Sequence, residues 1–156
     1  MLDIVLISFG KMKDKNFNAA SQEYLKRLAP YAKIRLEELA AEPFNSESDK
    51  LKAKRKEGER LAAALDKYPE AEIFILDENG AESDSRKFSE VLESGERRKL
   101  VFAVGGSLGI SADILAAGYG SLSLSKMTLP HELAKVVLLE QIYRGLAIIR
   151  GKQYHH

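Results

Sequence analysis

A serine flanked by glycines, in the turn from Gly105 to Gly109, has the spacing of a catalytic nucleophile. The pattern Gly-x-Ser-x-Gly holds the serine of many hydrolases on a sharp turn between a strand and a helix. Such an enzyme also needs an acid and a histidine. Here Ser107 would require His131, and Asp113 is the only acid between them on the chain. Because Asp113 falls in the helix directly after the turn, it is poorly placed to reach a histidine.

The same turn has two other interpretations. It is not Gly-x-Gly-x-x-Gly and no lysine follows it, so the common phosphate-binding loops are not matched. Its glycines could let a strand and a helix pack closely, or they could let a ligand approach the backbone. The turn alone does not distinguish these alternatives.

A histidine follows a proline at the start of the most apolar segment of the chain. Proline is favoured in the first turn of a helix, so a helix that begins near Pro130 has His131 in that turn. The positive end of the helix dipole there favours a neutral imidazole, which can accept a proton. An ordinary surface histidine is the alternative. No other histidine or carboxylate stands at metal-ligand spacing around it, so we expect no metal site.

Basic side chains near the C-terminus could contact phosphate. Arg144 follows Glu140 by four residues, so it either pairs with that carboxylate or presents a fixed guanidinium to an anion. Tyr154 and His155 belong to a basic, aromatic tail that could stack on a base, although a frayed terminus is the default. Three further clusters, at 11–15, 50–56 and 97–99, could also contact phosphates or could be solvated surface.

The elements that must position these residues alternate between strand and helix. Short apolar runs at 4–8, 73–76 and 100–104 predict strands, as does the largely alternating stretch at 34–39, and residues 122–124 predict a last short one. Helices are expected at 14–28, 48–65, from Ser83 or Ser85 through Leu92, at 112–117 and at 133–149. The central strands are apolar on both faces, which predicts an α/β fold with a mainly parallel sheet covered by helices on both sides.

Ligands bind at the carboxyl ends of the strands in such sheets. Three loops occupy that position here. They follow Leu76 and Val104 and precede Pro130, and all three are rich in glycine or polar residues. We therefore expect a binding site where these loops meet.

Composition is consistent with one globular domain spanning residues 1–156. Hydrophobic residues make up 45% and charged residues 30% of the chain, the net charge is +1, and cysteine is absent. No apolar run is long enough to span a bilayer, and the short N-terminal run lacks a basic region, so we expect no membrane association and a cytoplasmic location.

Several motifs, in this order, carry a family resemblance. They are Gly10-Lys11 after the first strand, EYLKRLAPY at 23–31, KEGERL at 56–61, GGSLG at 105–109, SLSKMTLPHE at 123–132, EQIYRG at 140–145 and Tyr154-His155. Together they resemble the small SPOUT-class methyltransferases of 23S ribosomal RNA, the RlmH family, over essentially the whole chain. One departure is Gly145, where an alanine would be expected after the Tyr-Arg pair.

The resemblance implies a SPOUT fold with a C-terminal trefoil knot, a homodimer, and S-adenosyl-L-methionine as methyl donor without a metal. It implies methyl transfer to N3 of a pseudouridine in large-subunit rRNA, on the assembled ribosome. His131, Arg144, Tyr154 and His155 become catalytic candidates. The implied cofactor contacts are Leu76, Gly105, Gly106, Leu124, Ser125, Lys126, Met127, Thr128 and Leu129. The alternatives are the serine hydrolase centred on Ser107 and a non-catalytic RNA-binding module of the same fold.

Overall fold

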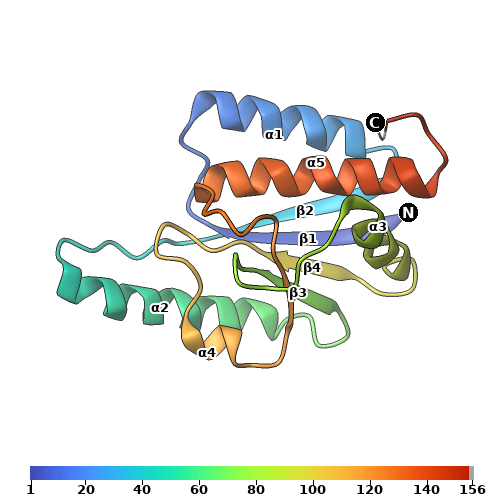
Figure 1. Ribbon diagram of the computed structural model, residues 1–156. Helices are drawn as coiled ribbons and strands as arrows, with labels where there is room; N and C mark the ends of the chain where they lie inside the picture. The colour runs from blue at the N-terminus through green and yellow to red at the C-terminus, as the bar shows by residue number, and fades with distance from the viewer. Residues whose placement is uncertain (155–156) are drawn as a thin grey trace.

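Five parallel strands form a single sheet in the computed structural model, which describes residues 1–154 (Figure 1). The strand order is β2-β1-β4-β3-β5, so β1, β4 and β3 occupy the interior and β2 and β5 form the edges. The strands are β1 (Leu2–Phe9), β2 (Ala32–Leu39), β3 (Glu72–Leu76), β4 (Leu100–Ala103) and β5 (Gly120–Leu122). The parallel sheet expected from the apolar strands is thereby confirmed.

Helices cover both faces of this sheet. In Figure 1, α1 and α5 lie together over one face, and α2 and α4 lie on the other. The helices are α1 (Lys15–Leu28), α2 (Glu47–Leu65), α3 (Ser85–Ser94), α4 (Ala112–Leu115) and α5 (His131–Ile149). The described residues include no helix that is both long and apolar enough to cross a membrane.

Alternating side chains of the interior strands pack into two separate cores. Ile4 and Leu6 of β1 pack in the cluster with α1, α3 and α5, whereas Val5 and Ile7 pack in the cluster with α2 and α4. Successive side chains of a strand point to opposite faces, so a strand buried on both sides must be apolar throughout. This requirement explains why the interior strands β1, β3 and β4 read as continuous apolar runs, whereas the edge strand β2 alternates.

The helix starts agree only partly with the sequence prediction. Asp14 caps α1 as expected, because its side chain accepts from the amides of Asn16 and Phe17 at 2.8 and 2.9 Å. Helix α5 begins at His131, two residues earlier than its apolar pattern suggested. The cap of α3 is Asp84 rather than Ser83 or Ser85, since the Asp84 carboxylate accepts from the Lys87 amide at 2.8 Å.

Helices α3 and α5 approach closely at Gly145. A Cβ atom at this position would stand 2.5 Å from Cδ1 of the buried Leu92. The residue that departs from the family pattern therefore makes room for a core leucine of α3. Because α5 is held this way against α3 and also against α1, its N-terminus is fixed at the carboxyl edge of the sheet.

Candidate functional site

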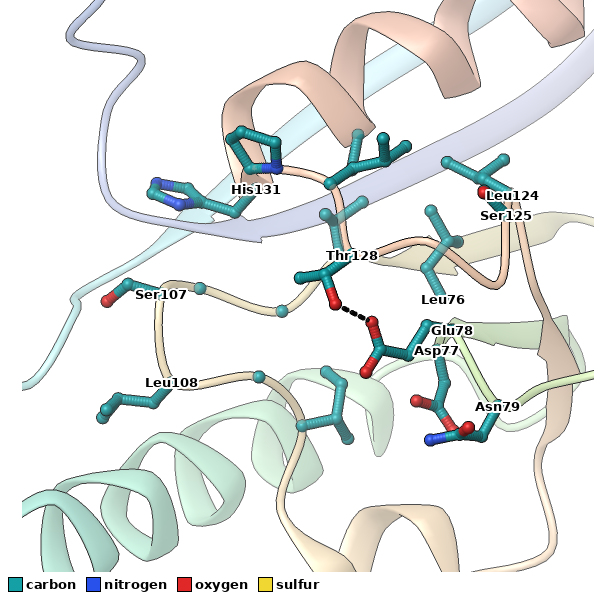
Figure 2. A pocket seen from close by; sticks show the side chains of 18 of the residues that line it. Leu76, Asp77, Glu78, Asn79, Ser107, Leu108, Leu124, Ser125, Thr128 and His131 are labelled. Atoms are coloured by element: carbon teal, nitrogen blue, oxygen red, sulfur yellow. Dashed lines mark hydrogen bonds between the residues drawn. The ribbon is translucent and has the colours of Figure 1, made fainter.

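A cavity of about 800 Å³ opens where three loops meet at the carboxyl edge of the sheet. These are the loops that follow β3 and β4 and the serine-rich loop that precedes α5, as the sequence predicted. Figure 2 shows side chains from all three around the cavity. Of the expected cofactor contacts, those that line it are Leu76, Gly105, Gly106, Leu124, Ser125, Met127, Thr128 and Leu129.

Lys126 is the expected contact that does not line this cavity. Its ammonium lies 3.7 Å from the carboxylate of Glu82, and the side chain is exposed. Its two neighbours, Ser125 and Met127, do line the cavity. In this conformation Lys126 therefore points away from the space that its neighbours enclose.

One wall of the cavity is apolar. Leu76 ends β3 and Leu122 ends β5. Both side chains are buried and the two strand ends are paired, so this part of the wall is held in place by the sheet. Leu124, Leu129 and Ile110 extend this wall. An apolar wall with convergent polar groups is the usual composition of a site for a small organic ligand.

Acidic residues that sequence reasoning did not single out form another part of the wall. Asp77, Glu78 and Asn79 follow β3 directly and line the cavity (Figure 2). The Thr128 hydroxyl donates to Glu78 Oε2 at 2.5 Å, which ties the serine-rich loop to the β3 loop. The position of these residues after an apolar strand was the available signal. Their carboxylates suit a cationic ligand or one that carries hydroxyl groups.

The glycine turn is shaped by packing within the protein. A Cβ at Gly105 would stand 3.1 Å from the carbonyl carbon of Gly109, and one at Gly106 would stand 3.2 Å from Phe9 Cβ. Gly109 itself has a φ of +77°, and its amide donates to the Gly106 carbonyl at 3.0 Å. The packing interpretation of the turn therefore holds for these glycines, and the tight turn leaves the backbone as the cavity wall.

Ser107 lacks the geometry of a hydrolase nucleophile. Within residues 1–154, only glycines have positive φ, so Ser107 is not on the strained turn that a nucleophile elbow requires. The side-chain hydrogen bonds of the described residues include none between Ser107 and either His131 or Asp113. The structure does not assemble the serine, histidine and acid that the hydrolase needs.

His131 stands at the boundary of two cavities. It is the first residue of α5 and lines the large cavity. It also lines a cavity of about 10 Å³, which is roughly the space of one water molecule and is shared with Ser8 and Lys135. His131 is thus the one catalytic candidate among the described residues that lies at the main cavity.

Arg144 and Tyr154 lie at the other end of α5. Thirteen residues separate Arg144 from His131, which is about 20 Å along a helix. Arg144 donates to Glu140 at 2.5 and 2.9 Å, and this hydrogen bond raises the pKa of the guanidinium. The Tyr154 ring centroid is 5.0 Å from that guanidinium. The expected Glu140–Arg144 pair is therefore formed, and within one chain it is remote from His131.

The tail packs on α1 and α5 through aromatic rings. Tyr154 meets Tyr143 edge-on with ring centroids 4.7 Å apart. Burial, followed by the neighbouring Tyr154, raises the pKa of the Tyr24 phenol to about 12. His155 lies outside the described residues. Within residues 1–154, no three carboxylate or histidine side chains come together as metal ligands.

Sequence comparison links the whole chain to one family. A family model described as "Predicted SPOUT methyltransferase" matches residues 2–155. The chain is 44% identical to a Bacillus cytotoxicus protein named ribosomal RNA large subunit methyltransferase H, and the match covers 99% of both. A protein of the same name from Bacillus thuringiensis strain Al Hakam is 42% identical, again over 99% of both chains.

Structure comparison supports the fold. A structure described as giving insight into 2-OH methylation of C/U34 on tRNA aligns with a TM-score of 0.52 and 19% identity, over 94% of this chain and 97% of the other. TrmJ from Z. mobilis aligns with a TM-score of 0.50 and 10% identity, over 93% of this chain and 70% of the other. These similarities concern the arrangement of helices and strands alone.

Proposed function

The chain belongs to the SPOUT methyltransferase family, and from this membership we propose that it methylates N3 of a pseudouridine in 23S ribosomal RNA with S-adenosylmethionine. The observation that carries the proposal is similarity over 99% of the chain to proteins named ribosomal RNA large subunit methyltransferase H. The assembled ribosome is the proposed substrate. The trefoil knot, which the resemblance implies, stays part of the same proposal.

The large cavity suits the proposed cofactor. The leucine-rich wall of the cavity, which includes Leu76, Leu124 and Leu129, can hold the adenine ring. Backbone groups of the glycine turn can form hydrogen bonds with the polar edge of that ring. Asp77 and Glu78 supply carboxylates for the ribose hydroxyls and for the positive charge of the ligand. When bound, S-adenosylmethionine supplies a methyl group carried on a cationic sulfur. This chemistry requires no metal.

His131 is the proposed proton acceptor. N3 of pseudouridine carries a proton that must leave before the nitrogen can act as a nucleophile. The imidazole lines the cavity from the first turn of α5. His131 would take the N3 proton, and the serine-rich loop beside it would hold the acceptor base in line.

A second copy of the chain is the proposed source of the remaining catalytic groups. About 20 Å of helix separates His131 from Arg144, so one chain cannot bring both to a single base. The outward side of α5 carries half-exposed Leu133 and Val136. In a homodimer with antiparallel α5 helices, Arg144 and Tyr154 of one copy would approach the cavity of the other.

The test is methyl transfer to ribosomes that carry the unmethylated pseudouridine. The purified protein is incubated with these ribosomes and isotopically labelled S-adenosylmethionine, and the rRNA nucleosides are mapped by mass spectrometry. We expect label at N3 of one large-subunit pseudouridine. Label on another atom or in the small subunit would contradict the stated specificity.

The non-catalytic RNA-binding alternative makes a different prediction in the same experiment. If the protein were a non-catalytic RNA-binding module, no nucleoside would be labelled. Calorimetry would then detect no heat of S-adenosylmethionine binding, even with ribosomes present. Cofactor binding together with label transfer excludes it.

A further inference from the structure

The N-terminal half of α2 projects past the carboxyl edge of the sheet (Figure 1). Lys54, from this half, lines the large cavity, although it comes from none of the three loops that form most of the wall. Leu51, one turn earlier, is 78% exposed. The exposed Leu51 thus lies one helical turn from a residue that lines the cavity.

Helical spacing places Leu51, Lys54 and Arg55 on one flank of α2. Residues three and four apart are neighbours on a helix surface, so these side chains form a row that continues to Gly58. The Cβ of Ser111 lies 2.9 Å from the point where a Gly58 Cβ would stand, and Ile114 of α4 is also adjacent. The row therefore runs along the side of α2 that faces α4 and the cavity mouth.

The two cations of this row have no carboxylate partner among the residues that the structure describes. Three other basic residues of α2 are paired: Lys50 with Glu47 at 2.7 Å, and Lys56 and Arg60 with Glu42 at 3.2 and 2.5 Å. Lys52, which lies outside the row, is also absent from the ion pairs of residues 1–154. The ion pairs among residues 1–154 include neither Lys54 nor Arg55. Positive charge is thus left uncompensated at the cavity mouth.

Exposed apolar side chains gather at the same place. Apart from Met1, the large hydrophobic residues that stay exposed in residues 1–154 are Leu51, Leu115 and Met127. Leu115 and Met127, which are 44% and 78% exposed, line the cavity from α4 and from the serine-rich loop. We call Leu51, Lys54, Arg55, Leu115 and Met127 the rim patch.

We propose that the rim patch binds the RNA strand on either side of the target nucleotide. Lys54 and Arg55 contact backbone phosphates, and Leu51, Leu115 and Met127 contact the faces of unstacked bases. RNA fits because it offers both chemistries together: a regular row of anions, and apolar base faces that open in loops. This inference rests on the proposed function, and it names the surface that holds the substrate.

The test compares the double variant Lys54→Ala/Arg55→Ala with the wild-type chain in filter binding to the unmethylated ribosomes over a series of salt concentrations. Each lost phosphate contact lowers the slope of log K against log salt by about 0.7 to 0.9, so we expect a decrease of about 1 to 2. At about 0.1 M salt we expect a roughly tenfold weaker affinity. Both substitutions lie on a solvated helix side and favour helix formation, so the fold is retained.

The matched control is Arg97→Ala/Arg98→Ala. These exposed cations precede β4 and so lie at the amino edge of the sheet, opposite the cavity. The control should leave affinity and salt slope unchanged. Leu51→Ser provides a second test, because it should weaken ribosome binding while keeping the wild-type salt slope.

Equal affinity and slope for the double variant and the wild type would overturn the proposal. So would a shift in oligomeric state for Leu51→Ser with unchanged ribosome affinity, because the patch would then be covered by a second copy. Methyl transfer is measured in parallel on the wild type. A wild-type chain that binds ribosomes through the patch without transferring methyl refutes the proposed reaction and leaves the RNA surface supported.

Discussion

For Ser107 and His131, the backbone geometry decides which of the roles suggested by the sequence is feasible. Both are required by the hydrolase interpretation, and they line one cavity from different elements: Ser107 from the loop after β4 and His131 from the start of α5 (Figure 2). Ser107 is exposed on a turn without the strained φ of a nucleophile elbow. His131 begins a long helix that is packed on two sides, so its position is well defined.

The first prediction compares the two residues in methyl transfer. Ser107→Ala should retain kcat within about threefold, because its hydroxyl takes no part in proton transfer. His131→Ala should lower kcat by about 10²- to 10⁴-fold, the usual contribution of a positioned acid or base. Single-turnover rates at saturating S-adenosylmethionine measure both. If His131→Ala matched the wild type, a side-chain base at this position would have to be abandoned.

Lys135 is a buried cation beside the site. The residue is 6% exposed, and burial lowers the pKa of its ammonium below 10.5, although Glu38 and Glu132 partly oppose the change. In the pH range between the folded pKa and 10.5, the unfolded chain binds more protons than the folded chain at this position. The contribution of Lys135 to the free energy of unfolding therefore rises with pH in that range and is unfavourable below it.

Lys135→Met is accordingly expected to stabilise the protein. Replacement of a buried unpaired charge by an apolar side chain should raise the free energy of unfolding at pH 7 by about 1 kcal/mol. The difference from wild type should shrink near pH 10. Urea denaturation at pH 7 and pH 10 measures the free energy of unfolding of the variant and the wild type. Lys26→Met, at an exposed lysine, is the control. A loss of stability in Lys135→Met at both pH values would show that the ammonium has a favourable partner in the fold.

At the scale of elements, the helix caps show the limit of local reasoning. Asp14 was identifiable because no competing cap stands beside it. At α3, Ser83, Asp84 and Ser85 are adjacent candidates, and the serines have other partners. Ser83 donates to the Asp84 carbonyl at 3.0 Å, and Ser85 donates to Gln141 of α5 at 2.7 Å. The contact with α5 is tertiary, so the sequence around α3 could not reveal it.

Asp84→Ala should therefore destabilise the protein, and Ser83→Ala should not. Loss of the cap is expected to lower Tm by about 2 to 4 °C at pH 7. The Lys87 amide lowers the pKa of the Asp84 carboxyl below 3.8, so the stabilisation is present above pH 4 and is lost as pH falls through the folded pKa. Thermal unfolding at pH 7 and pH 3 gives the comparison. An equal decrease in Tm for both variants would show that Asp84 is not the residue that caps α3.

At the scale of the whole molecule, α5 connects opposite edges of the sheet. Its first turn borders the cavity, and its last turns carry Arg144, which contacts Tyr154 of the tail. Its sequence is apolar on more sides than α1, α3 and the sheet can cover, which leaves Leu133 and Val136 half-exposed. A composite site between two copies would account for both the separation of the catalytic candidates and this outer surface.

The chain is therefore expected to be a dimer at micromolar concentration. Light scattering should give about twice the mass of one chain. Val136→Glu should shift the mass to that of a monomer and abolish most methyl transfer, because a charge would be buried in the interface. Ala63→Glu, on the exposed side of α2, is the control. A monomeric wild type with full activity would contradict the composite site.

Local patterns accounted for much of the fold. Apolar runs located the strands, Asp14 located the start of α1, and the need to cover strands that are apolar on both faces established a parallel sheet between helix layers. Because parallel strands end at one edge, the three loops around the cavity also followed from the sequence. The family resemblance, rather than a local pattern, supplied eight cofactor contacts that line it.

The strand order, the place of Lys54 at the cavity and the distance between His131 and Arg144 were decided by tertiary structure. Lys54 lies in a charged stretch whose members look alike on the chain, and only the packing of α2 against α4 separates it from Lys56, which pairs with Glu42. Such distinctions depend on contacts between residues far apart in the sequence. Periodicity and caps act over a few residues, so they determine which elements form, whereas the mutual burial of those elements determines which side chains meet.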